Sequence, residues 1–368
     1  MAFGFFKKKQ KGGNNDSRYF NLKIKEVINV AQDAVNVVFE NPGSKFKYEP
    51  GQFITIIDTI KGQKLRRAYS LCTTPFIDSN PAVTVKRVPD GRMSNHIADN
   101  FKAGQSVEVM EPMGQFTTVY YNEKVRKAIF FGGGSGITPL YSIIRSVLLK
   151  ESFSKITLVY GNRNQDFIIF KDQLEQLSEE YGGRFNIIHI LEDDPEGLTH
   201  HHGLPTTDTI GDVLQEVGYG DQAEYYICGP QPMMDVVKDG LIRADVDTAK
   251  IKMESFSAGV TSPEDLIEPK NESPAKGVSS EVTVLLDGEE FVLDVKAEKP
   301  ILDAGLDENI DMPYSCQSGL CTACRAKCIE GEVSLDGAEG LTDDEIKDGY
   351  VLLCVGKALS EKVKVEVG

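Results

Sequence analysis

Four cysteines near the C-terminal end of this 368-residue chain have a spacing that few folds can accommodate. Cys316, Cys321 and Cys324 form a C-x4-C-x2-C run, and Cys354 follows 30 positions after Cys324. This is the plant-type spacing for a [2Fe–2S] cluster, in which a loop wraps the cluster with three thiolates and a distant cysteine supplies the fourth. Gly319 inside the loop allows the positive φ and the close approach that such wrapping requires. We therefore predict a [2Fe–2S] cluster on these four ligands.

The same cysteines fit two other metal sites less well. Structural zinc sites favour paired C-x2-C knuckles, and only Cys321 and Cys324 form one here. Cys321, Cys324 and Cys328 also form a C-x2-C-x3-C run. The bacterial [4Fe–4S] pattern needs a shorter gap before that run and a proline after it, where this chain has Ile329. Cys328 is therefore predicted to be a buried packing cysteine and not a ligand.

Hydrophobic patterning divides the chain into three folded segments. Residues 17–122 show short alternating strands with polar turns, which predicts a small antiparallel β-barrel. Residues 123–256 alternate strands with helices, as in a doubly wound parallel sheet. Residues 280–368 open with a hairpin that turns near Asp-Gly and form an α+β module. Residues 257–279, with three prolines, are predicted to be a linker, and residues 1–16 a disordered basic tail.

The formal net charge of −16 is concentrated in the C-terminal segment. Residues 280–368 carry 20 acidic and 8 basic side chains, whereas the rest of the chain carries 36 and 32. An acidic balance argues against a nucleic-acid partner. The acidic module either docks on a basic patch of a partner protein or serves solubility, and the sequence leaves both open.

Cysteine usage and hydropathy bear on the compartment. The seven cysteines are an odd number in a chain much larger than disulfide scaffolds, which favours metal-bound thiolates in a reducing cytoplasm. No apolar run approaches the roughly 20 residues that span a bilayer, so no membrane span is expected.

Two short motifs in the first segment favour the binding of a ligand that contains phosphate groups. Arg67-Ala68-Tyr69-Ser70 stands at a strand end, and VKRVPDGRMSNHIADN follows it with Gly91 before a probable helix. The free N–H groups of a helix start are a natural phosphate site. EPMGQF comes next along the chain.

The second segment carries motifs of nucleotide-binding sheets. FFGGGSGITP places a glycine turn between a strand and a helix, which indicates a pyrophosphate site. Its candidate residues are Gly132, Gly133, Gly134, Gly136 and Thr138. CGPQPMM stands at a later strand end, with Cys228, Gly229 and Pro230, and Glu254-Ser255-Phe256 ends the segment.

In this order the motifs resemble the ferredoxin–NADP⁺ reductase superfamily, followed by a β-grasp ferredoxin domain that carries CQSGLCTAC and a later LLC. The resemblance covers nearly the whole chain. Within the superfamily it is similar to the reductase components of multicomponent oxygenases, the phenylacetyl-CoA epoxidase reductases among them. It implies FAD on the barrel, NAD(P)H on the parallel sheet and the [2Fe–2S] cluster on the ferredoxin module.

The resemblance also implies residue roles. Tyr69 is expected to stack on the isoalloxazine with Ser70 near its N5, while Arg67 pairs with the pyrophosphate. Cys228 is expected near the nicotinamide, with a core cysteine as the alternative, and Glu254 near the flavin. Phe256 is expected to cover the flavin or the adenine. The rest of the phosphate cradle is expected to consist of Lys86, Arg87, Gly91, Met93 and Ser94.

The choice of nucleotide depends on the end of the strand KITLVYGN. An acidic side chain there would accept from a ribose 2′-OH, whereas an arginine would meet a 2′-phosphate. The chain has Asn162 and Arg163 there, with Asp166 further on, which favours NADPH. NADH remains the alternative, because the family often has Gly-Arg where Leu204 follows Gly203 here.

Together these inferences predict a reductase that passes electrons from NADPH through FAD and the cluster to an acceptor protein, expected to be an oxygenase component. A stand-alone reductase or an electron-transfer subunit of a dehydrogenase is the second enzymatic interpretation. An iron–sulfur redox sensor is the non-enzymatic one. The intact R-A-Y-S and C-G-P motifs argue against the sensor, because sensing does not need nicotinamide turnover.

Overall fold

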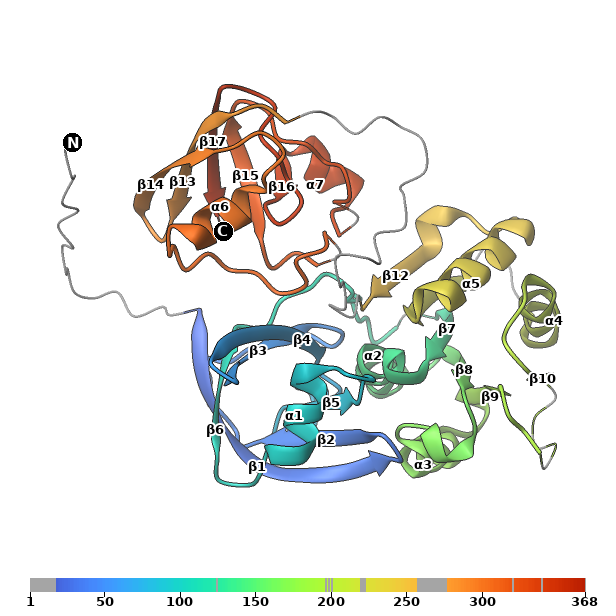
Figure 1. Cartoon of the computed structure of the whole chain (residues 1–368). Coiled ribbons are helices and arrows are strands. Elements are labelled where there is room, and N and C mark those ends of the chain that lie inside the picture. Colours follow the sequence, from blue (N-terminus) through green and yellow to red (C-terminus); the bar gives the residue numbers. More distant parts are fainter. Residues whose placement is uncertain are drawn as a thin grey trace, which may run out of the picture.

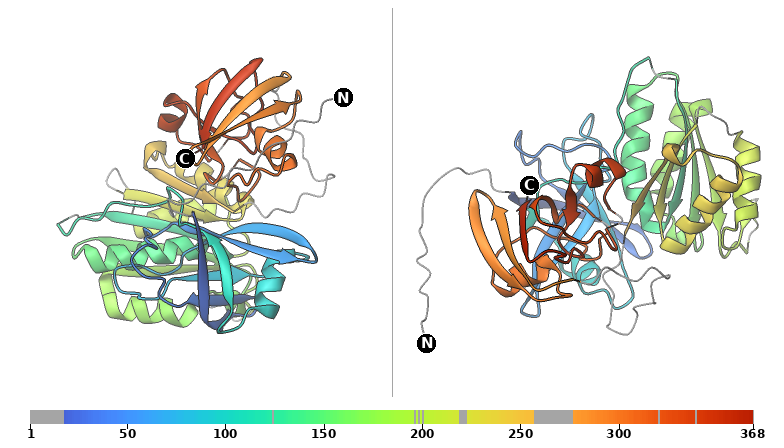
Figure 2. Two further views of the ribbon diagram at one scale, coloured as in Figure 1. Left: turned by 90° about the vertical axis from the view of Figure 1, so that its left-hand side faces the viewer. Right: turned by 90° about the horizontal axis from the view of Figure 1, so that it is seen from above.

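The computed structural model describes residues 18–123, 125–195, 197, 199, 201–218, 223–256, 277–319, 321–338 and 340–367. They form three folded domains, with the third seated above the junction of the first two (Figures 1 and 2). The predicted tail and most of the predicted linker lie outside the described residues. Within the described part of the chain, no helix is long and apolar enough to cross a membrane.

The first domain, hereafter called the FAD domain after the cofactor that its motifs lead us to expect, is a curled antiparallel sheet with strand order β4-β3-β6-β1-β2-β5. Its elements are β1 (Tyr19–Ala31), β2 (Ala34–Phe39), β3 (Phe53–Ile60), β4 (Gln63–Ser70), β5 (Ala82–Lys86), α1 (Arg92–Asn100) and β6 (Ser106–Met110). The two edge strands approach each other at a bridge between Leu71 and Val83. Inward-facing aliphatic and aromatic residues of alternating strands fill the interior, as the sequence pattern predicts.

The second domain, hereafter the nucleotide domain, is a parallel sheet with strand order β10-β9-β8-β7-β11-β12. Its strands are β7 (Lys127–Gly133), β8 (Lys155–Asn162), β9 (Phe185–Leu191), β10 (His201–His202), β11 (Ala223–Gly229) and β12 (Ile251–Ser255). Its α-helices are α2 (Ile137–Lys150), α3 (Lys171–Tyr181), α4 (Thr207–Val217) and α5 (Gln231–Arg243). The strand order reverses between β7 and β11, which makes the predicted doubly wound arrangement.

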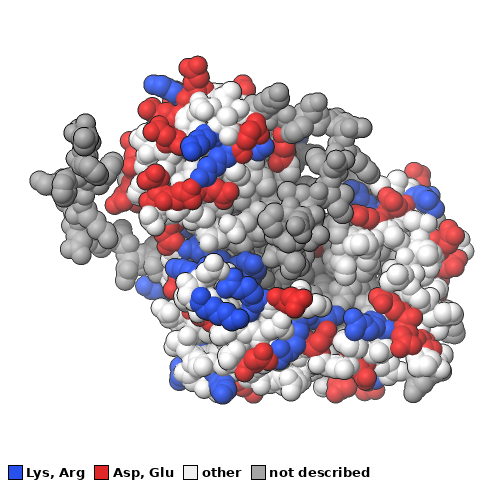
Figure 3. All heavy atoms as spheres, viewed as in Figure 1, with Lys and Arg blue, Asp and Glu red and all other residues white. Residues whose placement is uncertain are grey.

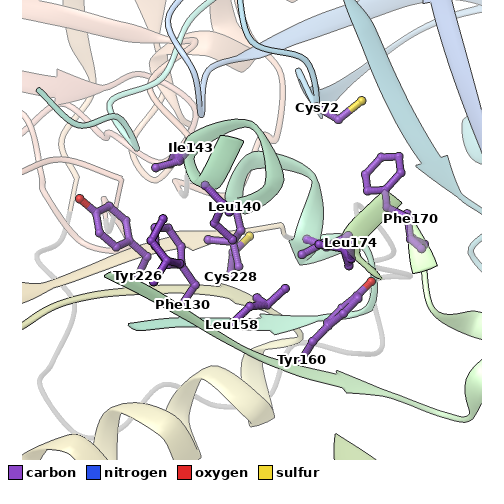
Figure 4. Packing of buried hydrophobic residues seen from close by; sticks show 14 of the residues in the cluster. Cys72, Phe130, Leu140, Ile143, Leu158, Tyr160, Phe170, Leu174, Tyr226 and Cys228 are labelled. Carbon is purple, nitrogen blue, oxygen red and sulfur yellow. The ribbon is translucent and has the colours of Figure 1, made fainter. Parts of the chain in front are cut away.

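Alternate side chains of the central strands separate the two faces of this sheet. Phe130, Leu158 and Tyr226 pack with α2 and α3 on one face, as Figure 4 shows around Leu140. Their strand neighbours, such as Phe131, pack under α4 and α5 on the other face. A sheet buried on both faces needs continuously apolar strands, and the run KAIFF supplies one.

The third domain, hereafter the ferredoxin domain, is a mixed five-stranded sheet with order β14-β13-β17-β15-β16. Its elements are β13 (Ser280–Leu286), β14 (Glu289–Val295), α6 (Ile301–Asp307), β15 (Arg325–Glu330), α7 (Asp343–Lys347), β16 (Tyr350–Leu352) and β17 (Lys362–Val367). The predicted hairpin turns at Asp287 and Gly288, both at positive φ. This is the geometry of a type I′ turn, which suits the twist of the two strands.

The FAD and nucleotide domains share an apolar and hydrogen-bonded interface along α2. Ala34, Cys72, Ala82 and Phe116 of the first domain belong to the same buried cluster as the α2 residues. On the polar side, the guanidinium of Arg145 donates to both carboxylate oxygens of Asp78, at 2.6 and 3.0 Å. These contacts hold the two domains as one packed unit.

A buried ion pair closes the start of the nucleotide domain. Arg126, just before β7, donates from Nε and Nη2 to the two carboxylate oxygens of Glu151 at 2.8 and 2.7 Å, and the two side chains are 1% and 0% exposed. Glu224 accepts from Nη1 at 2.9 Å, and Ser154 donates its hydroxyl to Glu151. Removing Glu151 would leave the buried Arg126 charge with the partly exposed Glu224 as its remaining carboxylate partner in this cluster, so the charge would be poorly compensated.

Glu151→Ala should therefore lower the unfolding free energy of the nucleotide domain by about 3–5 kcal/mol. Urea denaturation followed by circular dichroism measures the loss. Glu40→Ala, which breaks the exposed pair with Lys23, is the matched control, with an expected loss below about 1 kcal/mol. Equal losses in the two variants would contradict the account.

Candidate functional site: a flavin pocket, a nucleotide edge and a cluster loop

A cavity of about 220 Å³ opens where β4, β5 and α1 meet the glycine turn of the nucleotide domain. Its lining includes most of the residues that the sequence assigns to the flavin. These are Arg67, Tyr69, Ser70, Lys86, Gly91, Met93, Ser94 and Phe256, and Thr138 of the predicted nucleotide site lines the cavity with them. They come from two domains and from four separate stretches of the chain, and the fold brings them together.

The end of β4 supplies the base of this cavity. Ile54 of β3 pairs with Tyr69, which fixes the strand register at the cavity wall. Burial raises the pKa of the Tyr69 phenol, so the ring stays neutral and presents an apolar face. Arg67 donates to the carbonyl of Arg66 at 2.7 Å, and this contact directs its side chain along the strand. A neutral aromatic face beside a fixed cation fits a flavin with a pyrophosphate tail.

The start of α1 supplies an anion-binding edge of the cavity. Gly91 is the N-cap of this nine-residue helix and contributes no side-chain cap. A Cβ at Gly91 would lie 2.6 Å from Ser94 Oγ, so the turn requires glycine. Ser94 in turn accepts from the N–H of Val88 at 3.1 Å and holds the loop shut. Because the first N–H groups of the helix lack a capping side chain, they can bind phosphate oxygens.

One predicted cradle residue is not brought into the cavity. Arg87 is paired with Asp99 on the outer side of α1 at 2.6 Å and does not line the cavity. Arg92, the first residue of α1, lines it instead, together with Ser135. The sequence did carry the signal for Arg92, because a cation in the GRMS turn lies at the same helix start.

The glycine turn and the C-G-P motif meet at the sheet's switch point. A Cβ at Gly136 would lie 2.0 Å from the carbonyl oxygen of Cys228, and one at Gly133 would lie 2.8 Å from Cδ of Pro230. A Cβ at Gly229 would lie 3.0 Å from the amide nitrogen of Gly133. The glycines therefore let two main chains pack together at the ends of β7 and β11, where ligands bind in such sheets.

Cys228 and Glu254 lie opposite each other on β11 and β12 but have different surroundings. The Cys228 thiol is fully buried in the cluster around Leu140, where burial raises its pKa well above the usual value (Figure 4). Its side chain thus matches the core-cysteine alternative. Burial raises the pKa of Glu254 to about 8, so this carboxyl keeps its proton at neutral pH.

The expected ribose end of the nucleotide site is more acidic than the sequence motif suggested. Asn162 is buried, while Arg163 is exposed and stacks its guanidinium 4.7 Å from the centre of the Phe167 ring. The N–H of Asp193, just beyond β9, donates to the carbonyl of Arg163 at 2.7 Å. An adjacent hollow of about 230 Å³ is lined by Asn164, Gln165, Asp166, Leu191, Asp193, Asp194 and Pro195. The acidic run after β9 was the overlooked signal.

The four predicted ligand cysteines gather around one loop. The side chain of Cys316 lies next to those of Cys321 and Cys354, and that of Cys354 also lies next to Cys324. Cys324 and Cys354 are buried, whereas Cys316 and Cys321 are partly exposed. Within the described ranges, no three His, Cys, Asp or Glu side chains are arranged around the position of a single metal ion.

The loop around these cysteines has the features that a [2Fe–2S] cluster needs. Gly319 has φ +76°, and a Cβ there would lie 1.8 Å from the carbonyl oxygen of Gly337. The N–H of Ser318 donates to the Cys316 sulfur at 3.4 Å. The Ser315 hydroxyl is buried and has no partner among the described residues, which leaves it free for a sulfide. The donor set and its cradle fit the cluster.

Cys328 lies apart from these four, but it is not buried as predicted. It is half-buried on β15, and its sulfur lies 3.6 and 3.5 Å from the carbonyl oxygens of Glu330 and Gly331. The register shift between Cys328 and Glu330 explains the difference, because it turns the strand end outward.

A larger hollow of about 680 Å³ lies between all three domains. Cys321 and Thr322 of the cluster loop line it, together with Phe53 of β3 and Glu254 of β12. Phe53 pairs with Ser70 at the wall of the flavin cavity. Phe53 therefore links the two sites, because it lines the same hollow as the cluster loop and is paired with a residue that lines the flavin cavity.

Comparison with known proteins agrees with this arrangement. Residues 20–118 match the oxidoreductase FAD-binding domain, 130–239 the oxidoreductase NAD-binding domain, and 284–359 the 2Fe-2S iron-sulfur cluster binding domain. The ferredoxin reductase component of 3-ketosteroid-9-alpha-monooxygenase from Rhodococcus rhodochrous is 34% identical over 95% of this chain and 97% of its own length. The chain belongs to the family of oxygenase ferredoxin reductases.

Two further proteins have the same domain coverage. One subunit of 1,2-phenylacetyl-CoA epoxidase from Escherichia coli (strain K12) is 31% identical to this reductase, over 95% of this chain and 97% of its own length. The solved structure of phthalate dioxygenase reductase, at 26% identity and a TM-score of 0.59, covers 95% of this reductase and 98% of that chain.

This reductase is an oxidoreductase with FAD, a [2Fe–2S] cluster and a pyridine nucleotide as its cofactors. When bound, the flavin accepts a two-electron hydride and the cluster releases electrons singly, while the protein aligns the carriers. The chain's own part would be to hold the flavin against β4, to admit the nucleotide at the switch point, and to keep the cluster loop beside both.

The cysteine contacts predict which thiols the cluster requires. Serine at Cys316, Cys321, Cys324 or Cys354 should each abolish the [2Fe–2S] absorbance and EPR signals, whereas Cys328→Ser should keep them. NADPH oxidation with ferricyanide should survive in all five variants, because that dye accepts electrons from flavin. Reduction of cytochrome c should fall sharply in the first four. A native cluster spectrum in Cys354→Ser would contradict the ligand assignment.

Proposed function

We propose that this reductase takes hydride from NADPH and delivers single electrons from its cluster to a separate oxygenase component. The observation that carries the proposal is the shared hollow, where Cys321 of the cluster loop, Glu254 of the nucleotide domain and Phe53 of the flavin sheet meet. Carriers that exchange electrons must lie close together. The relatives named above belong to monooxygenase and epoxidase systems, which supports an oxygenase as the acceptor.

In this proposal the pocket residues have distinct tasks. Tyr69 stacks on the isoalloxazine, Ser70 lies near its N5, and Arg67 binds the pyrophosphate together with the start of α1. Glu254, with its pKa raised to about 8, is a neutral hydrogen-bond donor near the flavin at pH 7. Phe256 lines the cavity and is partly exposed, and in this proposal it covers the flavin.

The nucleotide preference rests on opposing charges at the ends of β8 and β9. Arg163 is exposed and positioned over Phe167, and a 2′-phosphate would gain a charge-assisted contact there. Asp193 and Asp194 line the adjacent hollow and favour the free ribose hydroxyls of NADH. We propose NADPH as the substrate, with NADH as the second candidate that these two carboxylates support.

Arg163→Ala should raise KM for NADPH by about tenfold or more, since a lost charge-assisted contact is worth roughly 1.5–3 kcal/mol. The KM for NADH should change little, and kcat should be retained because the contact is the same in ground and transition states. Steady-state kinetics with ferricyanide measure both. Asp193→Asn is the complementary variant and should improve use of NADPH. A parent enzyme that already prefers NADH would overturn the NADPH proposal.

The proposed partner surface is the acidic face around the cluster loop. Asp344 and Asp348 are exposed on and after α7, and Asp336 is exposed beside Gly337, which packs on the cluster loop. Glu345 belongs to the same acidic stretch but is buried and bonded to Arg325 at 2.5 Å, so it is not available to a partner. Opposite charge on the acceptor would speed the encounter and orient it. The free thiols support a reducing compartment, and we propose the cytoplasm.

Cytochrome c, a basic one-electron acceptor, provides a direct test of this surface. Its reduction should slow steeply as the ionic strength rises to physiological values, where the Debye length falls to about 8 Å. Changing Asp336, Asp344 and Asp348 together to Asn should reproduce the loss at low salt. The cluster spectrum and ferricyanide reduction should stay unchanged.

The matched control removes the same charge from the opposite edge of the ferredoxin sheet. Glu281, Glu289 and Asp294 are exposed on the β13–β14 hairpin, at the far edge from α7 (Figure 1). Their triple neutralisation should leave cytochrome c reduction within about twofold, because only charges near the docking face steer the encounter. Equal effects of the two triples would show that net charge alone acts.

A further inference from the structure

The strand that lines the flavin cavity also contacts the ferredoxin domain. Arg67 and Tyr69 of β4 line the cavity, whereas Arg66 does not. Arg66 is the neighbour of Arg67 on this strand, and the side chains of the two residues point to opposite faces of the sheet. The guanidinium of Arg66 is 2% exposed although no acid of its own domain is paired with it in the described structure.

The partners of Arg66 lie in the segment that leads into the cluster loop. Nη2 of Arg66 donates to Asp311 at 2.5 Å, and Nη1 donates to the carbonyl oxygen of Met312 at 3.3 Å. The guanidinium also lies 4.6 Å from the centre of the Tyr314 ring. Asp311 stands five residues before Cys316, so one buried cation connects the flavin strand to the start of the loop.

A second contact reaches the other end of the cluster loop. Gln115, in the EPMGQF motif of the FAD domain, donates to Glu345 at 2.6 Å. Glu345 also accepts from Arg325, the residue after Cys324, and its carboxylate caps α7 through Thr342. The FAD domain therefore contacts the loop on both sides of its cysteines.

The charge distribution over the interface agrees with these contacts. Figure 3 shows Lys and Arg gathered over the end of the FAD domain that faces the ferredoxin domain, and acidic side chains along the facing border of the latter. At the start of β1, Arg18 adds a bond to the carbonyl oxygen of Val367 at 3.2 Å and a pair with Asp287 at 3.1 Å. The interface is polar, in contrast to the apolar α2 interface.

We propose that Arg66–Asp311 and Gln115–Glu345 form an interdomain clamp that docks the cluster loop against the flavin strand. Arg66 and Gln115 are positioning residues, because neither of them lines the flavin cavity or is one of the four predicted ligand cysteines. Electron tunnelling falls steeply with distance, so loosening the clamp slows the passage of electrons from flavin to cluster. Hydride transfer to the flavin does not cross this interface and keeps its rate.

The test uses the full-length holoprotein, loaded with FAD and cluster, in anaerobic stopped flow with NADPH. Asp311→Ala and Gln115→Ala should each slow the cluster phase, and together they should slow it by roughly tenfold or more. The flavin phase should stay within about twofold, since its residues are untouched. Arg66→Lys should keep only part of the contact with Asp311 and Met312, because an ammonium group cannot reproduce the two-pronged geometry of the guanidinium.

Two readouts separate docking from a change in the cluster itself. Hydrogen exchange of residues 311–315 should rise in the clamp variants, while the cluster EPR spectrum and reduction potential stay at the parent values. Asp307→Ala is the matched control, because Asp307 is an exposed carboxylate of the same domain whose partner, Lys299, is also in that domain. It should leave the rates and the exchange unchanged.

The alternatives give different results. Asp311 is 62% exposed, so its variant should fold even if Arg66→Ala does not. A cluster phase that is unchanged in the Asp311→Ala, Gln115→Ala double variant would overturn the clamp. A shifted reduction potential with unchanged exchange would also overturn it, since the contact would then tune the cluster and not dock it.

Discussion

Close approach of main chains is the constraint on which both redox sites depend. At the nucleotide edge, Gly136 lies so near the carbonyl of Cys228 that a Cβ would come within 2.0 Å of it. In the cluster loop, a Cβ at Gly319 would come within 1.8 Å of the carbonyl oxygen of Gly337. Any side chain at these positions would force two segments apart and open the site. These main-chain contacts therefore fix the shapes of the flavin cavity and of the cluster loop.

The two domain interfaces are built from different interactions, and the difference suits their tasks. Along α2 the FAD and nucleotide domains share a buried apolar cluster, which fixes the cavity between them. The ferredoxin domain instead meets the FAD domain through Arg66, Gln115 and Arg18. Polar interfaces of this kind permit relative motion more readily than apolar ones. A domain that must receive electrons internally and release them to a partner benefits from such an interface.

The charges in each domain match the ligand or partner that is expected to bind there. Cationic and helix-start groups line the flavin cavity, where an anionic cofactor tail is expected. Acids dominate the ferredoxin domain, where a protein partner is proposed to dock. The end of β8 and β9 combines one arginine with several carboxylates, so the nucleotide preference there depends on the balance between Arg163 and Asp193.

The sequence by itself determined the domain order and the fold classes, and it predicted four cluster ligands, because each depends on local spacing. The C-x4-C-x2-C run, the glycine turn and the strand periodicities are all readable within short windows. Only the tertiary structure decided which side chains converge. Arg87 is paired with Asp99 and does not line the cavity, Arg92 is among the residues that line it, and Cys228 packs into the core. The contact of Arg66 with Asp311 joins residues 245 positions apart, and no local pattern encodes such a pairing.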